Sequence, residues 1–232
     1  MLALIYDVHG NLPALEAVLS DMAAQGADAY LIGGDVALFG AWPQDTVARL
    51  QELAPATWIR GNGERWTADP GAAPEPVRGA THATRAALGD ALVAELDGLP
   101  ESAPLAHGTR AWHASPVSDV RSFWPEPAAD EAELLEGSSD ARLVFGHTHL
   151  PFARTSDVGG VALVNPGSVG MPLDGDRRAA YALLHDDGTI EHRRVAYDHE
   201  SVPAALRARF GEEEGWVRRI LHRLTYACME PQ

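Results

Sequence analysis

The sequence has no lysine, a single cysteine and no long apolar segment, and each of these absences excludes a class of protein. Every one of the 18 basic residues is arginine, and the formal net charge is −15. A chain this acidic repels other polyanions, so we expect no binding to nucleic-acid polymers. Cys228 stands alone, which excludes an intrachain disulfide and is compatible with a reducing compartment. No apolar run approaches the roughly 20 residues that cross a bilayer, so we expect no membrane partner.

The start of the chain shows no targeting segment. Residues 1–6 lack a basic region and a cleavage site, and the next residue, Asp7, already belongs to a motif. A signal peptide could not be removed without losing Asp7, so we predict a cytoplasmic protein. With 232 residues and 46% hydrophobic content, the chain can bury a large core. We expect one domain over residues 1–232, with C-terminal helices at about 200–227 packed on it.

Apolar residues recur at helical spacing near the C-terminus. They are Trp216, Val217, Ile220, Leu221 and Leu224. Such a face is typical of a helix that docks on its own domain. The alternative is a contact between two copies of the chain in a homo-oligomer.

The first 62 residues alternate between strand and helix patterns. Strands are predicted at residues 2–6, 29–32 and 57–60, and helices from Asn11 to Gly26 and over residues 44–53. This order predicts parallel strands joined by right-handed crossovers, which is an α/β fold. Polar motif residues follow each strand directly, and open α/β sheets place their ligands at this edge.

The second half of the chain contains short strands without regular helices between them. They are predicted at residues 111–113, 143–145, 161–164, 180–184 and 190–195. We expect these strands to form a second sheet packed against the first. The proline- and glycine-rich stretch from Pro70 to Gly79 predicts a loop, which is either a lid or a plain connector.

Seven residues in separate segments are candidate metal ligands. They are Asp7, His9, Asp35, Asn62, His113, His147 and His149. Carboxylate, amide and imidazole groups without a thiolate suit Mn, Fe, Zn or Ni. Taken singly, each motif is common in turns and on surfaces, but all of them end strands in one α/β pattern. Seven ligands exceed the three or four of one catalytic zinc, so the set favours two ions that share a carboxylate. A hydrolase is therefore the first hypothesis.

The motifs also resemble a known family. Asp-x-His, Gly-Asp, Gly-Asn, a lone His and Gly-His-Thr-His, in this order, resemble the calcineurin-like metallophosphoesterase superfamily from Asp7 to about Tyr197. Residues 164–170, Val-Asn-Pro-Gly-Ser-Val-Gly, are similar to a signature of its small prokaryotic branch, the YfcE-type phosphodiesterases. The resemblance implies a β-sandwich of two mixed sheets flanked by helices, and a small phosphoester as substrate.

The resemblance further implies two divalent transition-metal ions, with Mn first and Fe, Zn or Ni as alternatives. It divides the candidates into two ligand sets: Asp7, His9 and His149 for one ion, and Asn62, His113 and His147 for the other. Asp35 would bridge the ions and be catalytic together with Asn62, whose amide hydrogens could donate to a phosphoryl oxygen. A hydroxide bridging the ions would serve as the nucleophile, because two cations lower the pKa of a shared water.

One position departs from the family pattern. Many members have a histidine directly after the Gly-Asn pair, where it is thought to help the leaving group, and here Gly63 occupies it. His82 on a following helix could replace this histidine, although a surface role also explains it. Arg60 and Asn11 are further candidates for substrate contact, and helix capping alone would explain Asn11.

Two functions therefore compete. The first is a metal-dependent phosphodiesterase, and the absent histidine argues against simple monoester hydrolysis. The second is a binding scaffold on the same fold, as in the retromer subunit that resembles this family. Because a scaffold tolerates the loss of ligands and all seven are present, we expect the enzyme. The motifs specify neither the natural substrate nor the metal.

Overall fold

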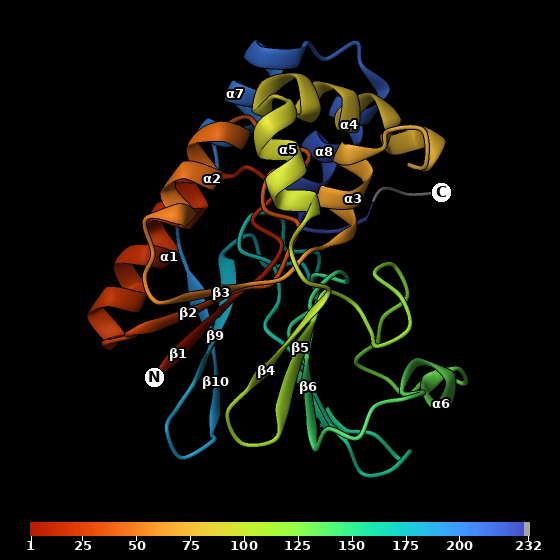
Figure 1. The fold of residues 1–232 in the computed structure, drawn as a ribbon. Coiled ribbons are helices and arrows are strands. Elements are labelled where there is room, and N and C mark those ends of the chain that lie inside the picture. The colour runs from red at the N-terminus through yellow and green to blue at the C-terminus, as the bar shows by residue number, and fades with distance from the viewer. Residues whose placement is uncertain (230–232) are drawn as a thin grey trace.

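The computed structural model describes residues 1–229, and their strands form two sheets that face each other (Figure 1). The first sheet contains β1 (Leu2–Ile5), β2 (Ala29–Ile32), β3 (Ala56–Trp58), β9 (Ala179–Leu184) and β10 (Ile190–Val195). Its strand order is β10-β9-β1-β2-β3, with β1, β2 and β3 parallel. The parallel β1–β2–β3 core was predicted from the sequence.

The second sheet contains β4 (Ser102–Leu105), β5 (Thr109–Trp112), β6 (Arg142–Val144), β7 (Phe152–Thr155) and β8 (Ala162–Asn165). Its order is β4-β5-β6-β8-β7, in which the inner three strands are parallel and the two edge strands antiparallel. Both sheets are therefore mixed. The fold that the resemblance implied, two mixed sheets flanked by helices, is confirmed.

One part of the predicted topology is wrong. The strands near residues 180–184 and 190–195 were expected in the second sheet, but β9 pairs antiparallel with β1 and β10 pairs with β9. All six residues of β9 are buried, because this strand lies inside the first sheet with cores on both faces. A short, fully apolar strand suits the interior of any sheet, and its partner is decided by contacts far away in the sequence.

Helix α1 (Leu12–Gln25) covers the outer face of the first sheet together with α2 (Pro43–Gln51) (Figure 1). The Asn11 side chain caps α1 by accepting from Ala14 N at 3.2 Å, and Gly26 ends it with a left-handed φ of 80°. The apolar stripe of α1 packs on Ile5, Ile32 and Tyr181 in one buried cluster. A second cluster, including Leu4 and Val144, fills the space between the two sheets.

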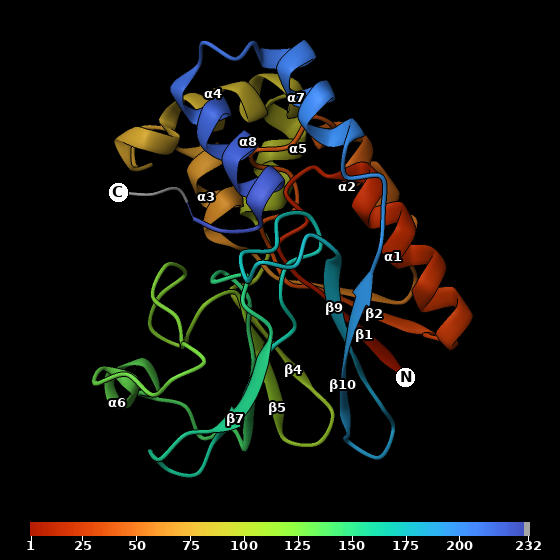
Figure 2. The same cartoon turned by 180° about the vertical axis from the view of Figure 1, so that it is seen from behind.

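The remaining helices form a layer above the ends of the strands, apart from the short α6 (Figures 1 and 2). They are α3 (Asn62–Ala68), α4 (Glu75–Leu88), α5 (Asp90–Asp97), α6 (Glu131–Leu134), α7 (Ser201–Phe210) and α8 (Gly215–Tyr226). The loop predicted up to Gly79 is shorter, because α4 already begins at Glu75 with Pro76 in its first turn, where proline is tolerated. No helix among residues 1–229 is long and apolar enough to cross a membrane.

The apolar face of α8 packs on its own chain. Trp216, Val217, Ile220 and Leu221 are buried in one cluster with residues of α4 and of the loop after β2. Gly79 of α4 makes the close approach possible, because a Cβ there would lie 2.8 Å from Trp216 Cδ1. The buried residues of this face are therefore covered by their own chain.

Truncating this contact should destabilise the fold. We expect Trp216→Ala to lower the free energy of unfolding by about 3–5 kcal/mol, because a large buried aromatic side chain is replaced by a cavity. Tyr226→Ala on the same helix is the control, since Tyr226 is 61% exposed. Chemical denaturation of both variants checks this, and equal losses would contradict the packing argument.

Candidate metal centre

The loops that follow five strands converge at one edge of the two sheets, below the helical layer. They carry all seven candidate ligands: Asp7 and His9 after β1, Asp35 after β2, Asn62 after β3, His113 after β5, and His147 and His149 after β6. Six of these residues are buried, and His147 is half-buried. The structure thus brings together side chains from positions up to 142 residues apart.

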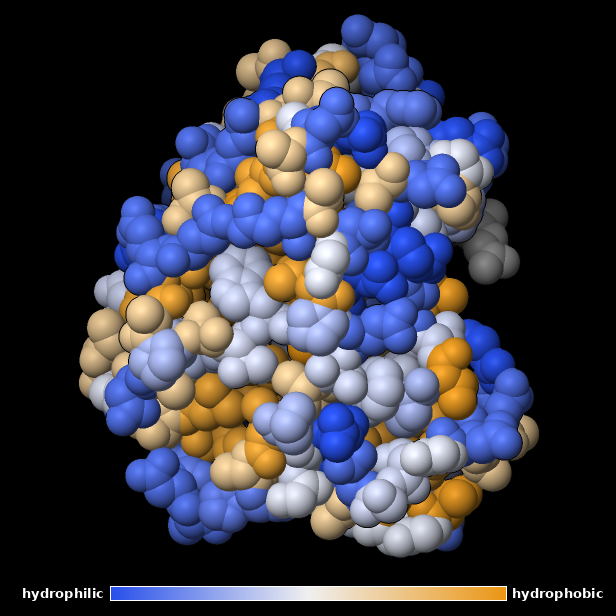
Figure 3. Space-filling model, in the orientation of Figure 1, coloured by the Kyte–Doolittle hydropathy of each residue, from blue (hydrophilic) through white to orange (hydrophobic). Residues whose placement is uncertain are grey.

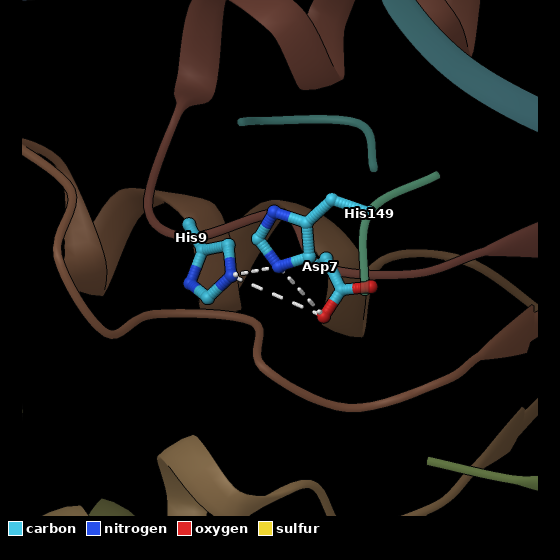
Figure 4. A group of neighbouring side chains, drawn as sticks. All are labelled: Asp7, His9 and His149. Carbon is cyan, nitrogen blue, oxygen red and sulfur yellow. Dashed lines mark hydrogen bonds and ion pairs between the residues drawn. The ribbon is translucent and has the colours of Figure 1, made fainter. Parts of the chain in front are cut away.

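The first group consists of Asp7, His9 and His149 (Figure 4). The two Nε2 atoms of His9 and His149 lie 3.1 Å apart. Asp7 Oδ1 lies 3.5 Å from His149 Nε2 and 3.9 Å from His9 Nε2. Three electron-pair donors therefore face one point, at distances over which one ion can contact all of them.

The second group is centred on Asn62. Its Oδ1 lies 2.8 Å from His147 Nδ1 and 3.0 Å from His113 Nε2. Asp35 lies between the two groups, with Oδ1 3.5 Å from His113 Nε2 and Oδ2 3.9 Å from His9 Nε2. One carboxylate oxygen thus faces each group, which is the arrangement that a bridging ligand requires.

The hydrogen bonds around the cluster leave electron pairs unmatched, and this fits bound cations. Asp7 Oδ1 is buried and has no hydrogen-bond partner among residues 1–229. Asn62 Oδ1 faces two ring nitrogens, although turning the amide over would let Nδ2 donate to both. A cation between the oxygen and the rings removes this conflict, because all three atoms can then donate electron pairs to it.

Three of the imidazoles are oriented by backbone carbonyl groups. His9 Nδ1 lies 2.9 Å from Leu38 O, and His113 Nδ1 lies 2.9 Å from Gly33 O. His149 Nδ1 lies 2.6 Å from Met171 O. A ring that donates through Nδ1 keeps the lone pair on Nε2, and metal-binding histidines are commonly fixed in this way. The Nε2 atoms that point into the cluster are therefore available to a metal.

Burial and neighbouring charges shift the protonation of the cluster. Burial, together with the nearby His149, lowers the pKa of His9 to about 3, and burial lowers the pKa of His147 to about 4. Both rings are therefore neutral at pH 7, which is the form that binds metal. Burial raises the pKa of Asp35 to about 7; the charge of His113 opposes this rise, and the charges of Glu64 and Asp7 add to it. A cation beside Asp35 would relieve this repulsion.

The backbone of the ligand loops is unusual. Asp7, His9, Asp35, His147 and His149 have φ values of 53°, 49°, 53°, 67° and 61°. Left-handed residues other than glycine cost roughly 1–3 kcal/mol each and persist only where the surroundings hold them. Hydrogen bonds between the loops provide that support, with His9 N donating to Asp35 O at 2.9 Å and Gly146 N to His113 O at 2.8 Å.

The turn at residues 165–168 also supports the cluster. Ser168 Oγ donates to Asp7 O at 2.7 Å, while Asn165 Nδ2 donates to Gly146 O at 3.0 Å and to Thr148 Oγ1 at 2.9 Å. The two side chains thus connect the loops after β1 and β6, which carry the first ligand group.

Glu64 has a role that was not recognised from the sequence. Its buried carboxylate accepts three backbone hydrogen bonds, from Asp35 N at 2.9 Å, Val36 N at 2.9 Å and Gly61 N at 2.8 Å. One side chain therefore ties the Asp35 loop to the turn that precedes Asn62. In the sequence, an acid in the first turn of a helix looks like ordinary capping, so nothing local distinguished it.

Gly63 is required by close packing. A Cβ at this position would lie 2.7 Å from Asp35 Oδ1, and the Gly63 N–H donates to the same oxygen at 2.6 Å. The missing histidine therefore has a steric consequence that the motif comparison alone did not suggest. With the backbone as it is in this structure, a side chain at position 63 would require the Asp35 carboxylate or the turn at Gly61 and Asn62 to shift.

Of the three residues expected to contact substrate, Asn11, His82 and Arg60, only Arg60 lines the cavity beside His113. Asn11 is buried and its amide is occupied, because it caps α1 and donates to Gly170 O at 2.8 Å. His82 is exposed on α4 and is not among the residues lining the cavity beside His113. Arg60 does line that cavity, although its guanidinium is paired with Asp97 at 3.0 Å and Glu101 at 2.7 Å.

Comparison with known proteins agrees with this geometry. A family model described as the calcineurin-like phosphoesterase superfamily domain matches residues 1–188. Phosphodiesterase YfcE of Escherichia coli K12 is 30% identical over 191 residues, which are 78% of this chain and 85% of that protein. The crystal structure of a metallophosphoesterase from Sphaerobacter thermophilus is 28% identical, with a TM-score of 0.81 over 97% of this chain and 98% of that one. A hypothetical protein of Pyrococcus horikoshii OT3 shares the fold at 21% identity, with a TM-score of 0.83 over 99% of this chain and 100% of that one.

The three backbone hydrogen bonds that Glu64 accepts, which we call the Glu64 clamp, can be tested by measuring the stability of variants. We expect Glu64→Gln to lower the free energy of unfolding by about 2 kcal/mol, because its amide N–H₂ must face a backbone N–H that the carboxylate had satisfied. Glu64→Ala should cost more. Glu126→Gln is the matched control at an exposed position, and denaturation curves that do not separate it from Glu64→Gln would refute the clamp.

Gly63→Ala tests the packing against Asp35. We expect it to weaken Mn²⁺ binding by roughly tenfold or more, because even small displacements of a positioned group are costly. Gly215→Ala is the control, since a Cβ there would have its nearest neighbour at 3.8 Å. Calorimetric titration with Mn²⁺ measures both, and unchanged binding by Gly63→Ala would contradict the steric account.

Proposed function

We propose that this chain, which belongs to the calcineurin-like phosphoesterase superfamily, hydrolyses small phosphodiesters with the help of two divalent metal ions. The observation that carries the proposal is the position of Asp35, whose two oxygens face two separate groups of buried ligands. A single ion would leave one of these groups without a cation. The two-ion arrangement accounts for every one of the seven side chains.

The roles of the residues follow from their positions. Two divalent ions held here would activate a water as nucleophile and neutralise charge on the phosphoryl oxygens. Asp7, His9 and His149 would hold one ion, and Asn62, His113 and His147 the other. The first set is one cluster of donor atoms in the structure, and the second is supported by the distances from Asn62 Oδ1 to the two rings. Asp7 also lies in a cluster with Asp35 and His113, so its carboxylate is close to both sets. Mn²⁺ is our first choice, and Fe, Zn and Ni suit the same ligands.

Asp35 and Asn62 have tasks beyond ligation in this proposal. Asp35 would be shared by both ions, and Gly63 N and Glu64 hold its carboxylate and backbone in place for this role. With its carbonyl oxygen on the second ion, Asn62 would keep its amide hydrogens free to donate to a phosphoryl oxygen.

Three observations favour a small diester over other substrates. The relative YfcE is named a phosphodiesterase, and this chain lacks the histidine after Asn62 that is associated with difficult leaving groups. The net charge of −15 opposes a nucleic-acid polymer. The scaffold alternative has no observation in its favour, because every ligand is present and buried or half-buried.

Metal dependence tests the proposal directly. We expect the purified protein to hydrolyse bis-p-nitrophenyl phosphate with added Mn²⁺ and to lose this activity in EDTA. Elemental analysis should find two equivalents of metal. Inactivity across Mn, Ni, Co and Zn would favour the scaffold.

Asp35→Asn tests the two-ion arrangement. It keeps the size of the side chain but removes the shared negative charge, so one equivalent of metal should be lost and kcat should fall by at least about a hundredfold. Asp45→Asn on the exposed side of α2 is the control. Two equivalents retained by Asp35→Asn would exclude the bridging role.

A further inference from the structure

The ligand cluster is flanked by two unlike cavities. The cavity beside His113 is about 300 Å³ and polar, with Arg60, Arg65 and Ser115 in its wall. The cavity beside His147 is about 410 Å³, and its wall includes the apolar side chains of Val120, Trp124, Leu150 and Leu173. The second cavity has a size typical of small-molecule sites, and it reaches the metal centre through His147. In Figure 3 the molecule is hollowed between the helical layer and the lower sheet.

Trp124 is the distinctive feature of the apolar cavity. Its side chain is 51% exposed, and Val120 nearby is 40% exposed. An indole with this much free surface costs hydration free energy unless something covers it. Trp124 therefore offers aromatic surface, at the wall of the cavity, that the rest of residues 1–229 leaves half uncovered.

The segment that carries Trp124 is firmly held although it has no regular secondary structure. Phe123 is completely buried in the core against Phe145, with ring centroids 5.0 Å apart. Arg154 Nε donates to Trp124 O at 2.9 Å, and the Arg154 guanidinium is paired with the buried Glu131. The backbone that carries the indole is thus held before any ligand arrives, so little backbone ordering entropy is lost when a ring stacks on it.

We propose that Trp124 forms a subsite for a planar aromatic group attached to the phosphate, so that the substrate is a nucleotide-type phosphodiester. The proposal rests on the proposed function and deepens it. A planar ring matches the free face of the indole better than a flexible alkyl chain does, because stacking covers one flat surface with another. Because the cavity beside His113 is polar, we place the aromatic base of the nucleotide in the cavity beside His147.

The polar cavity supports this orientation. Arg65 donates to Asp119 from Nε at 2.6 Å and from Nη2 at 2.7 Å, and Arg60 is paired with Asp97 and Glu101. These paired charges make up one part of the wall, and Trp112, Pro116 and Val117 make up another. An aromatic base placed there would cover paired charges, and the Trp112 residue is less exposed than Trp124.

Binding of two ligands that differ only in the base tests the subsite. The probes are adenosine 5′-monophosphate and ribose 5-phosphate, titrated calorimetrically into the full-length protein with Mn²⁺. Base–aromatic stacking predicts that the nucleotide binds about tenfold more tightly. Trp124→Leu should bring this ratio close to one, whereas Trp124→Phe should keep most of it. Tyr226→Ala, which removes another exposed aromatic side chain, should leave the ratio unchanged.

Several outcomes would overturn the subsite. They are a ratio near one in the unmodified protein, a ratio that survives in Trp124→Leu, and octyl phosphate binding as tightly as the nucleotide. Hydrolysis of bis-p-nitrophenyl phosphate, measured in parallel, separates this proposal from the proposed function. An active enzyme without preference for the base refutes the subsite alone. A preference for the base without hydrolysis under any metal refutes the phosphodiesterase and supports an aromatic binding site.

Discussion

The structure depends on a set of electron-pair donors that point at one another in a buried space. Asp7, Asp35 and Asn62 supply oxygens and the four imidazoles supply nitrogens, with few hydrogens between them. Such a set is unfavourable by itself, since buried charges and unpaired acceptors both cost free energy. Divalent cations would turn the same arrangement into a favourable one. In the proposed enzyme, the free energy of metal binding would therefore be coupled to that of folding at this edge of the sheets.

Many contacts between loops together offset the unfavourable free energy of bringing these donor atoms close to one another. Five ligands adopt left-handed backbone conformations, and each follows a strand that is paired with a neighbour on both sides. Glu64, Ser168 and Asn165 then connect neighbouring loops through backbone groups. Glycines at the closest approaches, such as Gly146 beside Asp7 Oδ2, leave no room for a side chain. The loops that carry the candidate ligands thus support one another, and none of these supporting side chains is itself a candidate ligand.

The sequence predicted those features of the fold that depend on interactions between residues close together in the chain. Asn11 and Gly26 mark the two ends of α1, and the order of strands and helices predicted the parallel β1–β2–β3 core with the candidate ligands after it. The positions of β9 and β10 could not be predicted in this way, because strand order depends on contacts between distant segments. The metal role of the seven residues stays a prediction, although their convergence in space is now described. Glu64 was missed because its partners are backbone groups 28 and 29 residues away.

Chemistry and specificity are supplied by different parts of the molecule. The ligands lie on strand ends inside the core, where almost any substitution would disturb a neighbouring loop. Trp124 lies on a loop segment held by the buried Phe123 and by the hydrogen bond from Arg154 to the Trp124 carbonyl oxygen. Its side chain could change without moving a ligand, since it faces the cavity and leaves the core packing to its neighbour. A family built in this way can keep one metal centre while its members differ in the group beside the phosphate. For this reason the ligand motifs identify the family, whereas the substrate has to be inferred from the exposed residues around the metal centre.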